Sequence, residues 1–228
     1  MASDGILIAG IDEAGRGAVM GPMVIAGVSM TAKDENRLRK AGVKDSKLLT
    51  PARRENLSKL IEKTVRDVIV IKIGPCKIDN YRKTGVNLNQ IEAMKMADIA
   101  NYLKPARLYI DSPDTNIYKF QRFLKRMIEH EHEMVLEHYA DQKYVSVAAA
   151  SIIAKVNRDR DIDELRQKHG NIGSGYTSDA TTIKWLEDWL QNNSGFPDFV
   201  RKSWITADGM LKKKLQTSLM DWFRNLVK

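Results

Sequence analysis

The 228-residue chain carries 37 lysines and arginines against 29 aspartates and glutamates, a net charge of +8 at pH 7. This charge predicts a polyanionic partner, and nucleic acid is the commonest one. The 43% hydrophobic content is enough for a sizeable core, and no apolar run reaches the roughly 18 to 20 residues of a membrane-spanning helix. No secretory leader is recognisable, so we expect a cytoplasmic protein. The single cysteine, Cys76, excludes an intrachain disulfide and a thiolate metal cluster.

The first predicted strand runs directly into two acidic residues. Residues 6–11 are an apolar run typical of a buried strand, and Asp12 and Glu13 follow it. Residues 14–17, Ala-Gly-Arg-Gly, then form a flexible cationic turn. Because buried carboxylates are costly unless a metal, a partner or a shifted pKa stabilises them, the acidic pair indicates either a functional site or a plain surface turn.

Further strands and helices alternate along the chain. Two helices have clear start signals, Thr50 before Pro51 and Asn87 paired with Gln90. The second of these stops before the proline at 105. Strands are predicted at 23–30, 66–73, 107–110 and 133–138, and further helices at 116–129, 147–169, 182–190 and 210–227. This order predicts an α/β fold with a five-stranded mixed sheet flanked by helices and a helical C-terminal extension.

Parallel pairing would bring four acids to one edge of this sheet. If the first, fourth and fifth strands run parallel, right-handed crossovers place their carboxyl ends at the same edge, where open α/β sheets bind ligands. Each of these strands is predicted to end in an aspartate. The edge would therefore gather Asp12, Glu13, Asp111 and Asp141.

These four carboxylates predict a site for a hard divalent cation. With no cysteine and no paired histidines among them, Mg²⁺ or Mn²⁺ is favoured over zinc. Two such ions would activate water and stabilise the leaving oxygen of an in-line phosphoryl displacement. Adjacent residues of a strand face opposite sides, so Asp12 and Glu13 act together only if the strand ends or bends there. Gly15 and Gly17 permit that bend.

The segment Asp12-Glu13-Ala14-Gly15-Arg16-Gly17 begins a series of recognisable motifs. They continue at residues 21–26, 45–50, 109–111, 149–156, 173–176 and 201–204. In content and order these segments resemble ribonuclease HII, the type 2 ribonuclease H family, in its archaeal form. The resemblance implies a ribonuclease-H-like fold and an endoribonuclease that acts on RNA–DNA hybrids and on single ribonucleotides embedded in duplex DNA. It also implies cleavage on the 5′ side of the ribonucleotide to give 3′-hydroxyl and 5′-phosphate ends, in ribonucleotide excision and primer removal.

The resemblance also assigns roles to the glycine-rich turn and the acids. The family's four metal-binding acids match Asp12, Glu13, Asp111 and Asp141. The segment Gly15-Arg16-Gly17 would recognise the ribose 2′-hydroxyl, which distinguishes RNA from DNA.

Three further residues are predicted to bind substrate. Tyr176 matches the tyrosine that stacks on the sugar of the next nucleotide, and its alternative role is to cover the end of a helix. Lys47 and Lys155 are candidates for phosphate contacts, with a solvated helix face as the alternative. The chain departs from the commonest family pattern at Ala18, Val145, Ala148 and Thr177. None of these departures removes a charged catalytic group.

The C-terminal part is predicted as a separate helical region. Residues 1–169 would form the catalytic core, and residues 170–228 would complete the substrate groove. Within 216–223 the spacing of Gln216, Leu219, Trp222 and Phe223 resembles the motif by which replication and repair proteins bind the sliding clamp. In the alternative, an amphipathic helix covers the protein's own core with Leu215, Leu219, Trp222 and Leu226. Apart from a clamp, we expect a monomer.

Two other functions compete with this interpretation. We do not expect a nuclease of the HIII branch, whose members carry an extra N-terminal domain, because Asp12 lies close to the first residue of the sequence. A basic nucleic-acid-binding module that has lost catalysis would not be expected to keep all four acids.

Overall fold

The computed structural model describes residues 5–44 and 46–226, with side chains up to residue 216. The elements in chain order are β1 (Ile8–Ala14), β2 (Met23–Met30), α1 (Ala32–Lys40), the 3₁₀ helix η1 (Ser46–Leu48), α2 (Pro51–Thr64), β3 (Asp67–Ile73), α3 (Pro75–Lys83), α4 (Leu88–Leu103), β4 (Arg107–Asp111), α5 (Ile117–Lys125), β5 (Glu133–Glu137), α6 (Ala140–Lys143), α7 (Val145–His169), α8 (Ala180–Asn192) and α9 (Ile205–Leu226). In this part of the chain, no helix is both long and apolar enough to cross a membrane.

The chain divides into two compact units. The first comprises Met1–Arg16, Met23–Lys72 and Val86–Asp159, and the second comprises Gly17–Pro22, Ile73–Gly85 and Arg160–Lys228. The units meet inside α7, ten residues before the boundary predicted at 169, and the second unit includes two segments from the N-terminal half. The predicted division into a catalytic core and a groove-completing region stays a prediction.

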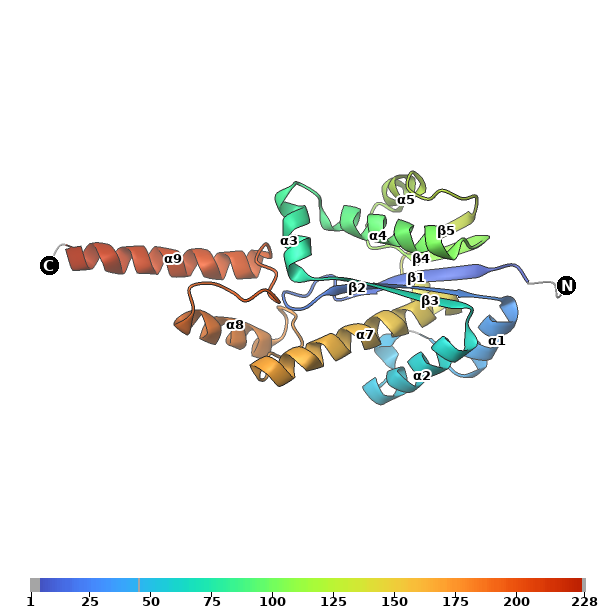
Figure 1. Cartoon of the computed structure of the whole chain (residues 1–228), viewed down its shortest axis with the longest axis horizontal. Helices are drawn as coiled ribbons and strands as arrows, with labels where there is room; N and C mark the ends of the chain where they lie inside the picture. Colours follow the sequence, from blue (N-terminus) through green and yellow to red (C-terminus); the bar gives the residue numbers. More distant parts are fainter. Residues whose placement is uncertain (1–4, 45, 227–228) are drawn as a thin grey trace. The chain divides into compact units, whose positions relative to one another are not determined.

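The first unit contains the sheet. The strands described form a five-stranded sheet in the order β3-β2-β1-β4-β5. β1 pairs antiparallel with β2 and parallel with β4, and β4 pairs parallel with β5. The predicted mixed sheet and the parallel arrangement of the first, fourth and fifth strands are therefore confirmed. In Figure 1, α4 and α5 lie on one face of the sheet, and α1 and α2 lie on the other.

Two glycines let helices approach the sheet closely. A Cβ atom on Gly27 of β2 would lie 2.2 Å from the side chain of Ile99 in α4. On the opposite face, a Cβ atom on Gly10 of β1 would lie 2.1 Å from the backbone carbon of Ser146, at the start of α7. That face is covered by a cluster that combines apolar residues of β2, α1 and α2 with the small residues of α7, such as Ala149. The central strands are thus buried on both faces.

Local start signals explain the helices that the sequence predicted well. The Thr50 hydroxyl accepts the backbone N–H of Arg53 at 3.3 Å, and Asn87 and Gln90 form the predicted capping box with bonds of 3.0 and 2.8 Å. α1 and α3 were not predicted. α1 buries only Leu38 and so has no apolar period in its sequence, although its capping box is complete.

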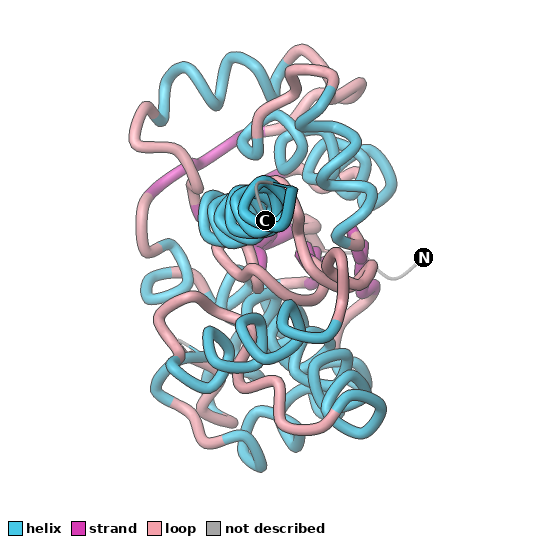
Figure 2. The backbone as a smooth tube through the Cα atoms, turned by 90° about the vertical axis from the view of Figure 1, so that its left-hand side faces the viewer, coloured by secondary structure: helices cyan, strands magenta, loops and turns pink. Residues whose placement is uncertain are grey.

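The second unit is mainly helical. Its apolar cluster joins α8, the start of α9 and residues near Met20, which bridges to Val200. The rings of Trp185 and Trp189 stack with centroids 5.0 Å apart. α9 is one helix of 22 residues. It is seen nearly end-on in Figure 2.

Candidate active site

β1 continues through the acidic pair rather than ending before it. Asp12 and Glu13 both lie within the strand, which remains paired with β2 as far as Ala14. The parallel pairing with β4 ends earlier, at Ile11 opposite Ile110. The predicted end of the strand was therefore wrong, because the long-range ladder to β2 extends it. The sheet instead opens on the β4 side, directly beside Asp12.

The other two aspartates lie on neighbouring elements. Asp111 is the last residue of β4. The fifth strand was predicted to end in Asp141, but β5 ends at Glu137 and Asp141 is the second residue of the short helix α6. Between them, Tyr139 adopts a left-handed conformation with φ of 58°. The backbone N–H of Ala140 donates to Asp111 Oδ1 at 3.1 Å, so this tight turn holds the Asp111 carboxylate in place.

Three of the acids share one electrostatic environment. Burial raises the pKa of Asp12 well above its ordinary value, and repulsion from Glu13 and Asp111 adds to this effect. Burial is also the main cause that raises the pKa of Glu13 to about 8. Repulsion from Glu92 adds to this rise, and it outweighs the positive charge of Arg16, which lowers the pKa. Burial raises the pKa of Asp111. A cation bound among these carboxylates would favour their ionised forms.

The donor set fits a hard divalent cation, although the residues that the structure describes form no closed ligand cage. Within the described residues, no three histidine, cysteine, aspartate or glutamate side chains form a ready-made metal-ligand set. Asp12 and Asp141 are only 5% and 3% exposed, so water alone does not solvate their carboxylates fully. Mg²⁺ is commonly held by one or two carboxylates together with waters and substrate phosphates. An open set of carboxylates suits that mode of binding.

Two serines support the acidic edge and were missed by the sequence predictions. A hydrogen bond from Ser151 of α7 lowers the pKa of Asp12, partly opposing the effect of burial. The Ser151 hydroxyl also lies 2.9 Å from that of Ser46 in η1, and both residues are buried. The signal in the sequence is one hydroxyl within the run of small and aliphatic residues at 147–154.

The Arg16 side chain turns toward α4 and the loop after β4. Its Nε lies 3.0 Å from Oε1 of Glu92, which is fully buried, and its Nη1 donates to the carbonyl oxygen of Pro113 at 3.0 Å. Its Nη2 donates to the side-chain oxygen of Asn89. These contacts anchor the turn after β1. The predicted substrate contact of Arg16 is therefore more readily made by its backbone than by its guanidinium group.

The backbone conformation requires glycine at only one of the two glycine positions in this turn. Gly15 has φ of 79°, a left-handed conformation that favours glycine directly after the strand. Gly17 has no such conformation, and a Cβ atom there would meet no described atom within 4 Å. The fold therefore does not require glycine at position 17.

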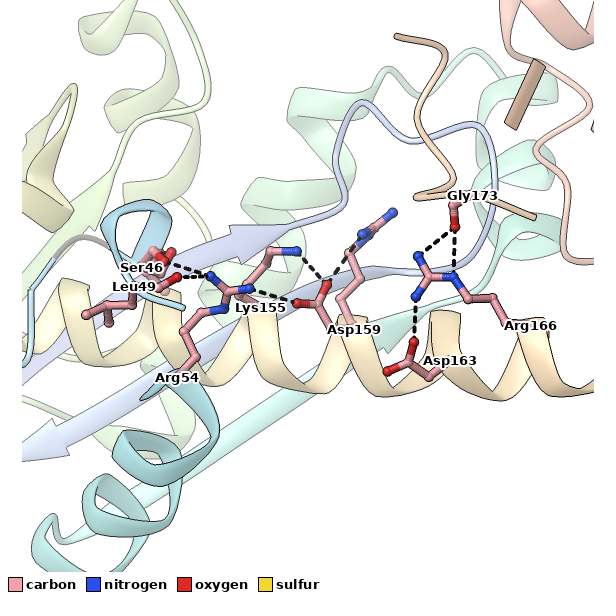
Figure 3. A network of polar contacts seen from close by, with 10 residues as sticks. Ser46, Leu49, Arg54, Lys155, Asp159, Asp163, Arg166 and Gly173 are labelled. Carbon is pink, nitrogen blue, oxygen red and sulfur yellow. Dashed lines mark hydrogen bonds and ion pairs between the residues drawn. The ribbon is translucent and has the colours of Figure 1, made fainter. Parts of the chain in front are cut away.

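The two candidate lysines have different surroundings. Lys47 is exposed on η1, and its charge lowers the pKa of Asp111, so the structure brings it near the acids. Lys155 instead forms an ion pair with Asp159 at 2.5 Å, and Arg54 approaches the same carboxylate at 3.5 Å (Figure 3).

Tyr176 lies in a tightly held loop of the second unit. The guanidinium group of Arg166 donates twice to the carbonyl oxygen of Gly173, at 3.1 and 2.8 Å (Figure 3). The backbone N–H of Ser174 donates to Asp179 at 2.6 Å and, as the main cause, lowers the pKa of that carboxyl to about 2. Tyr176 itself is half-buried. A fixed loop of this kind is suited to presenting a ring to a ligand.

The predicted clamp motif lies on α9. Gln216 is exposed, whereas the side chains of Leu219, Trp222 and Phe223 lie outside the described residues. Leu215, which the alternative interpretation assigns to the core, is 64% exposed. This exposure weighs against the core-covering alternative at that position.

Comparisons with known proteins agree on one family. A family model described as Ribonuclease HII matches residues 9–207. A relative, Ribonuclease HII of Pyrococcus horikoshii, is 46% identical over 203 residues, which cover 88% of this chain and 90% of the relative.

Solved structures with a similar fold include members of the same family. The crystal structure of the ribonuclease H2 from Pyrococcus horikoshii OT3 matches with a TM-score of 0.86 and 42% identity, covering 92% of this chain and 99% of that one. The structure of the PCNA:RNase HII complex from Archaeoglobus fulgidus matches with a TM-score of 0.81 and 45% identity, covering 89% and 96%. Bst-RNase HIII in complex with Mn²⁺ is 20% identical with a TM-score of 0.73, covering 92% and 70%, and this likeness extends to the fold alone.

Proposed function

The chain belongs to the ribonuclease HII family of endoribonucleases, which cleave RNA in RNA–DNA hybrids, and we propose that it also cuts at single ribonucleotides embedded in duplex DNA. The cut would fall on the 5′ side of the ribonucleotide and leave 3′-hydroxyl and 5′-phosphate ends. The observation that carries this proposal is the grouping of Asp12, Glu13 and Asp111 where the pairing of β1 with β4 ends. Their mutual repulsion is what a cationic cofactor would relieve.

In this proposal Asp12, Glu13, Asp111 and Asp141 hold Mg²⁺ or Mn²⁺, two ions during catalysis. The bound ions would lower the pKa of a water molecule and offset the charge that develops on the phosphate. Mn²⁺ as an alternative to Mg²⁺ is supported by the carboxylate donor set, because carboxylate oxygens suit both ions.

The chain's own residues position the acids and the substrate. Ser151 orients the Asp12 carboxylate, and the backbone N–H of Ala140 orients that of Asp111. Lys47 lies near Asp111 and would contact a substrate phosphate. Lys155 would reach a phosphate only by exchanging its ion pair with Asp159, so its role as a substrate contact is the weaker of the two.

Sugar recognition is assigned to two segments. The backbone of Gly15-Arg16-Gly17 would approach the ribose 2′-hydroxyl, since Arg16 anchors the turn from behind and Gly17 presents no side chain. Tyr176 would stack on the sugar of the next nucleotide. The proposed setting is cytoplasmic, in ribonucleotide excision and primer removal.

Cleavage of a DNA duplex that contains one ribonucleotide tests this function. With Mg²⁺ or Mn²⁺ present, we expect one cut on the 5′ side of the ribonucleotide and none in an all-DNA duplex of the same sequence. Asp12→Asn should abolish the cut. An uncut substrate, or equal cutting by the variant, would contradict the proposal.

We also propose that the C-terminal motif binds a sliding clamp. This is supported by the spacing of Gln216, Leu219, Trp222 and Phe223 and by the PCNA complex of the similar Archaeoglobus fulgidus protein. Alanine at both aromatic positions should abolish clamp binding without lowering the melting temperature. Leu215→Ala serves as a control on the same helix and should retain binding. A large loss of stability in the double variant would favour the core-covering alternative.

A further inference from the structure

The first unit contains a basic pocket formed by the start of α4, the loop after β4 and α5. Its volume is about 360 Å³. α4 and α5 lie next to one another on the same face of the sheet (Figure 1). The lining includes Asn89, Asp114, Phe123, Lys119, Arg122 and Arg126. None of these residues has a role in the proposed chemistry.

Asn89 links this pocket to the turn after β1. Its side-chain oxygen accepts a hydrogen bond from Arg16, and its amide nitrogen donates to Asp114 at 2.6 Å. Asp114 in turn lies only three residues after Asp111, the acid at the end of β4. The pocket wall therefore shares one short segment with the acidic edge and one hydrogen-bond network with the turn after β1.

The lining favours an anionic ligand. Its three cations are exposed, with Lys119 and Arg122 on α5 and Arg126 directly after it. Residues 115–128 contain no aspartate or glutamate. Asp114 is the one acid among the lining residues described, and both of its carboxylate oxygens accept hydrogen bonds, from a backbone N–H at 2.9 Å and from Asn89. Three cations against one acid leave a net charge of +2 in the lining.

We propose that this pocket binds backbone phosphates of the nucleic-acid substrate, on one side of the bond that is cut. The inference rests on the proposed function and adds a subsite to it. The guanidinium groups of Arg122 and Arg126 can each pair with a phosphate through two N–H donors. The ring of Phe123 offers a face for a base or a sugar. Small-ligand sites measure about 300 to 1,000 Å³, so the pocket has room for a phosphate and its sugar.

Binding of duplexes with different flanks tests the pocket directly. The variant combines Arg122→Gln with Arg126→Gln, and the control is Lys125→Gln, which removes a charge from the same helix but lines a different hollow beside His130 and His132. Fluorescence anisotropy measures the Kd of metal-free protein for a duplex with one ribonucleotide and long flanks, and for duplexes shortened on either side.

We expect the double variant to raise Kd about tenfold on the long duplex and to lower the slope of log Kd against log salt by about one for each cation removed. The loss should disappear when one particular flank is absent. The Lys125→Gln control should match the wild type on every duplex, and all proteins should share one melting temperature because the substituted side chains are exposed.

Three results with the duplexes would overturn the pocket assignment, and a competition result would replace its occupant. The three are an unchanged Kd in the double variant, an equal loss in the control, and a loss that does not depend on flank length. A nucleoside monophosphate that competes for this pocket in a flank-independent way would identify a free nucleotide as the occupant instead. Because Kd is measured without cleavage, a wild type that shows the flank effect but does not cut would refute the proposed function and leave the pocket assignment intact.

Discussion

The raised pKa of Glu13 makes the stability of the metal-free protein depend on pH. Burial, reinforced by Glu92, raises this pKa from 4.5 to about 8. Below pH 4.5 the carboxyl is protonated in both the folded and the unfolded chain. Between pH 4.5 and 8 only the unfolded chain releases the proton, so the free energy of unfolding falls as the pH rises. Above pH 8 the loss contributed by Glu13 is complete.

Glu13→Gln removes this loss while keeping the shape of the side chain. A rise from 4.5 to about 8 corresponds to at most about 5 kcal/mol. Because the side chain is partly exposed and water screens it, we expect the variant to be more stable than the wild type by about 2 kcal/mol at about pH 9. At about pH 5 the two proteins should differ little.

Urea unfolding in the presence of a chelator measures this difference at the two pH values. Glu187→Gln, at an exposed position of α8, controls for removal of a surface charge and should show no such pH dependence. Adding Mn²⁺ at the higher pH should stabilise the wild type more than Glu13→Gln. A variant that is less stable than the wild type at high pH, or equally shifted at both pH values, would refute the assigned environment of Glu13.

Three further substitutions test the structure around the site. Gly17→Ala should change the free energy of unfolding by no more than about 0.5 kcal/mol but raise KM for a ribonucleotide-containing duplex, and unchanged kinetics would contradict close approach of the substrate. Gly10→Ala places a Cβ atom 2.1 Å from the Ser146 backbone and should lower the free energy of unfolding in urea by about 3 kcal/mol or more. The control Gly5→Ala, whose Cβ atom would meet no atom within 4 Å, should leave that free energy unchanged. A Gly10→Ala protein as stable as the wild type would mean that α7 is packed differently. Tyr139→Gly should relieve the left-handed backbone by about 1 kcal/mol and retain cleavage, and a lower melting temperature would contradict the conformation of this turn.

The sequence predicted correctly those elements whose position depends on residues close together in the chain. Thr50 with Pro51 and Asn87 with Gln90 act within one helical turn, and both helices begin where these residues predicted. β2 is an almost wholly apolar run whose eight residues are all buried, so its composition alone indicates a buried strand. In β4 the apolar residues Leu108 and Ile110 alternate with less buried ones, which is the period of a strand.

The sequence did not predict features that depend on distant partners. β1 extends through Asp12 and Glu13 because β2 pairs with it, and an apolar run alone does not reveal that partner. Arg16 turns inward because Glu92, far along the chain, is buried beside it. Ser151 is one of several small residues in its segment, and only the folded structure shows that it forms a hydrogen bond with Asp12. The four acids were identified by resemblance and by strand ends, although two of those strand ends were placed wrongly.

The central claim is that Asp12, Glu13, Asp111 and Asp141 together bind the catalytic metal ions. The most direct test is calorimetric titration of Mn²⁺, with cleavage measured at the same Mn²⁺ concentrations. It compares the wild type with the single variants Asp12→Asn, Asp111→Asn and Asp141→Asn. We predict that each substitution weakens Mn²⁺ binding at least about tenfold and abolishes cleavage, with each variant still folded. Wild-type Mn²⁺ affinity and cleavage in any one of the three variants would contradict the proposed site.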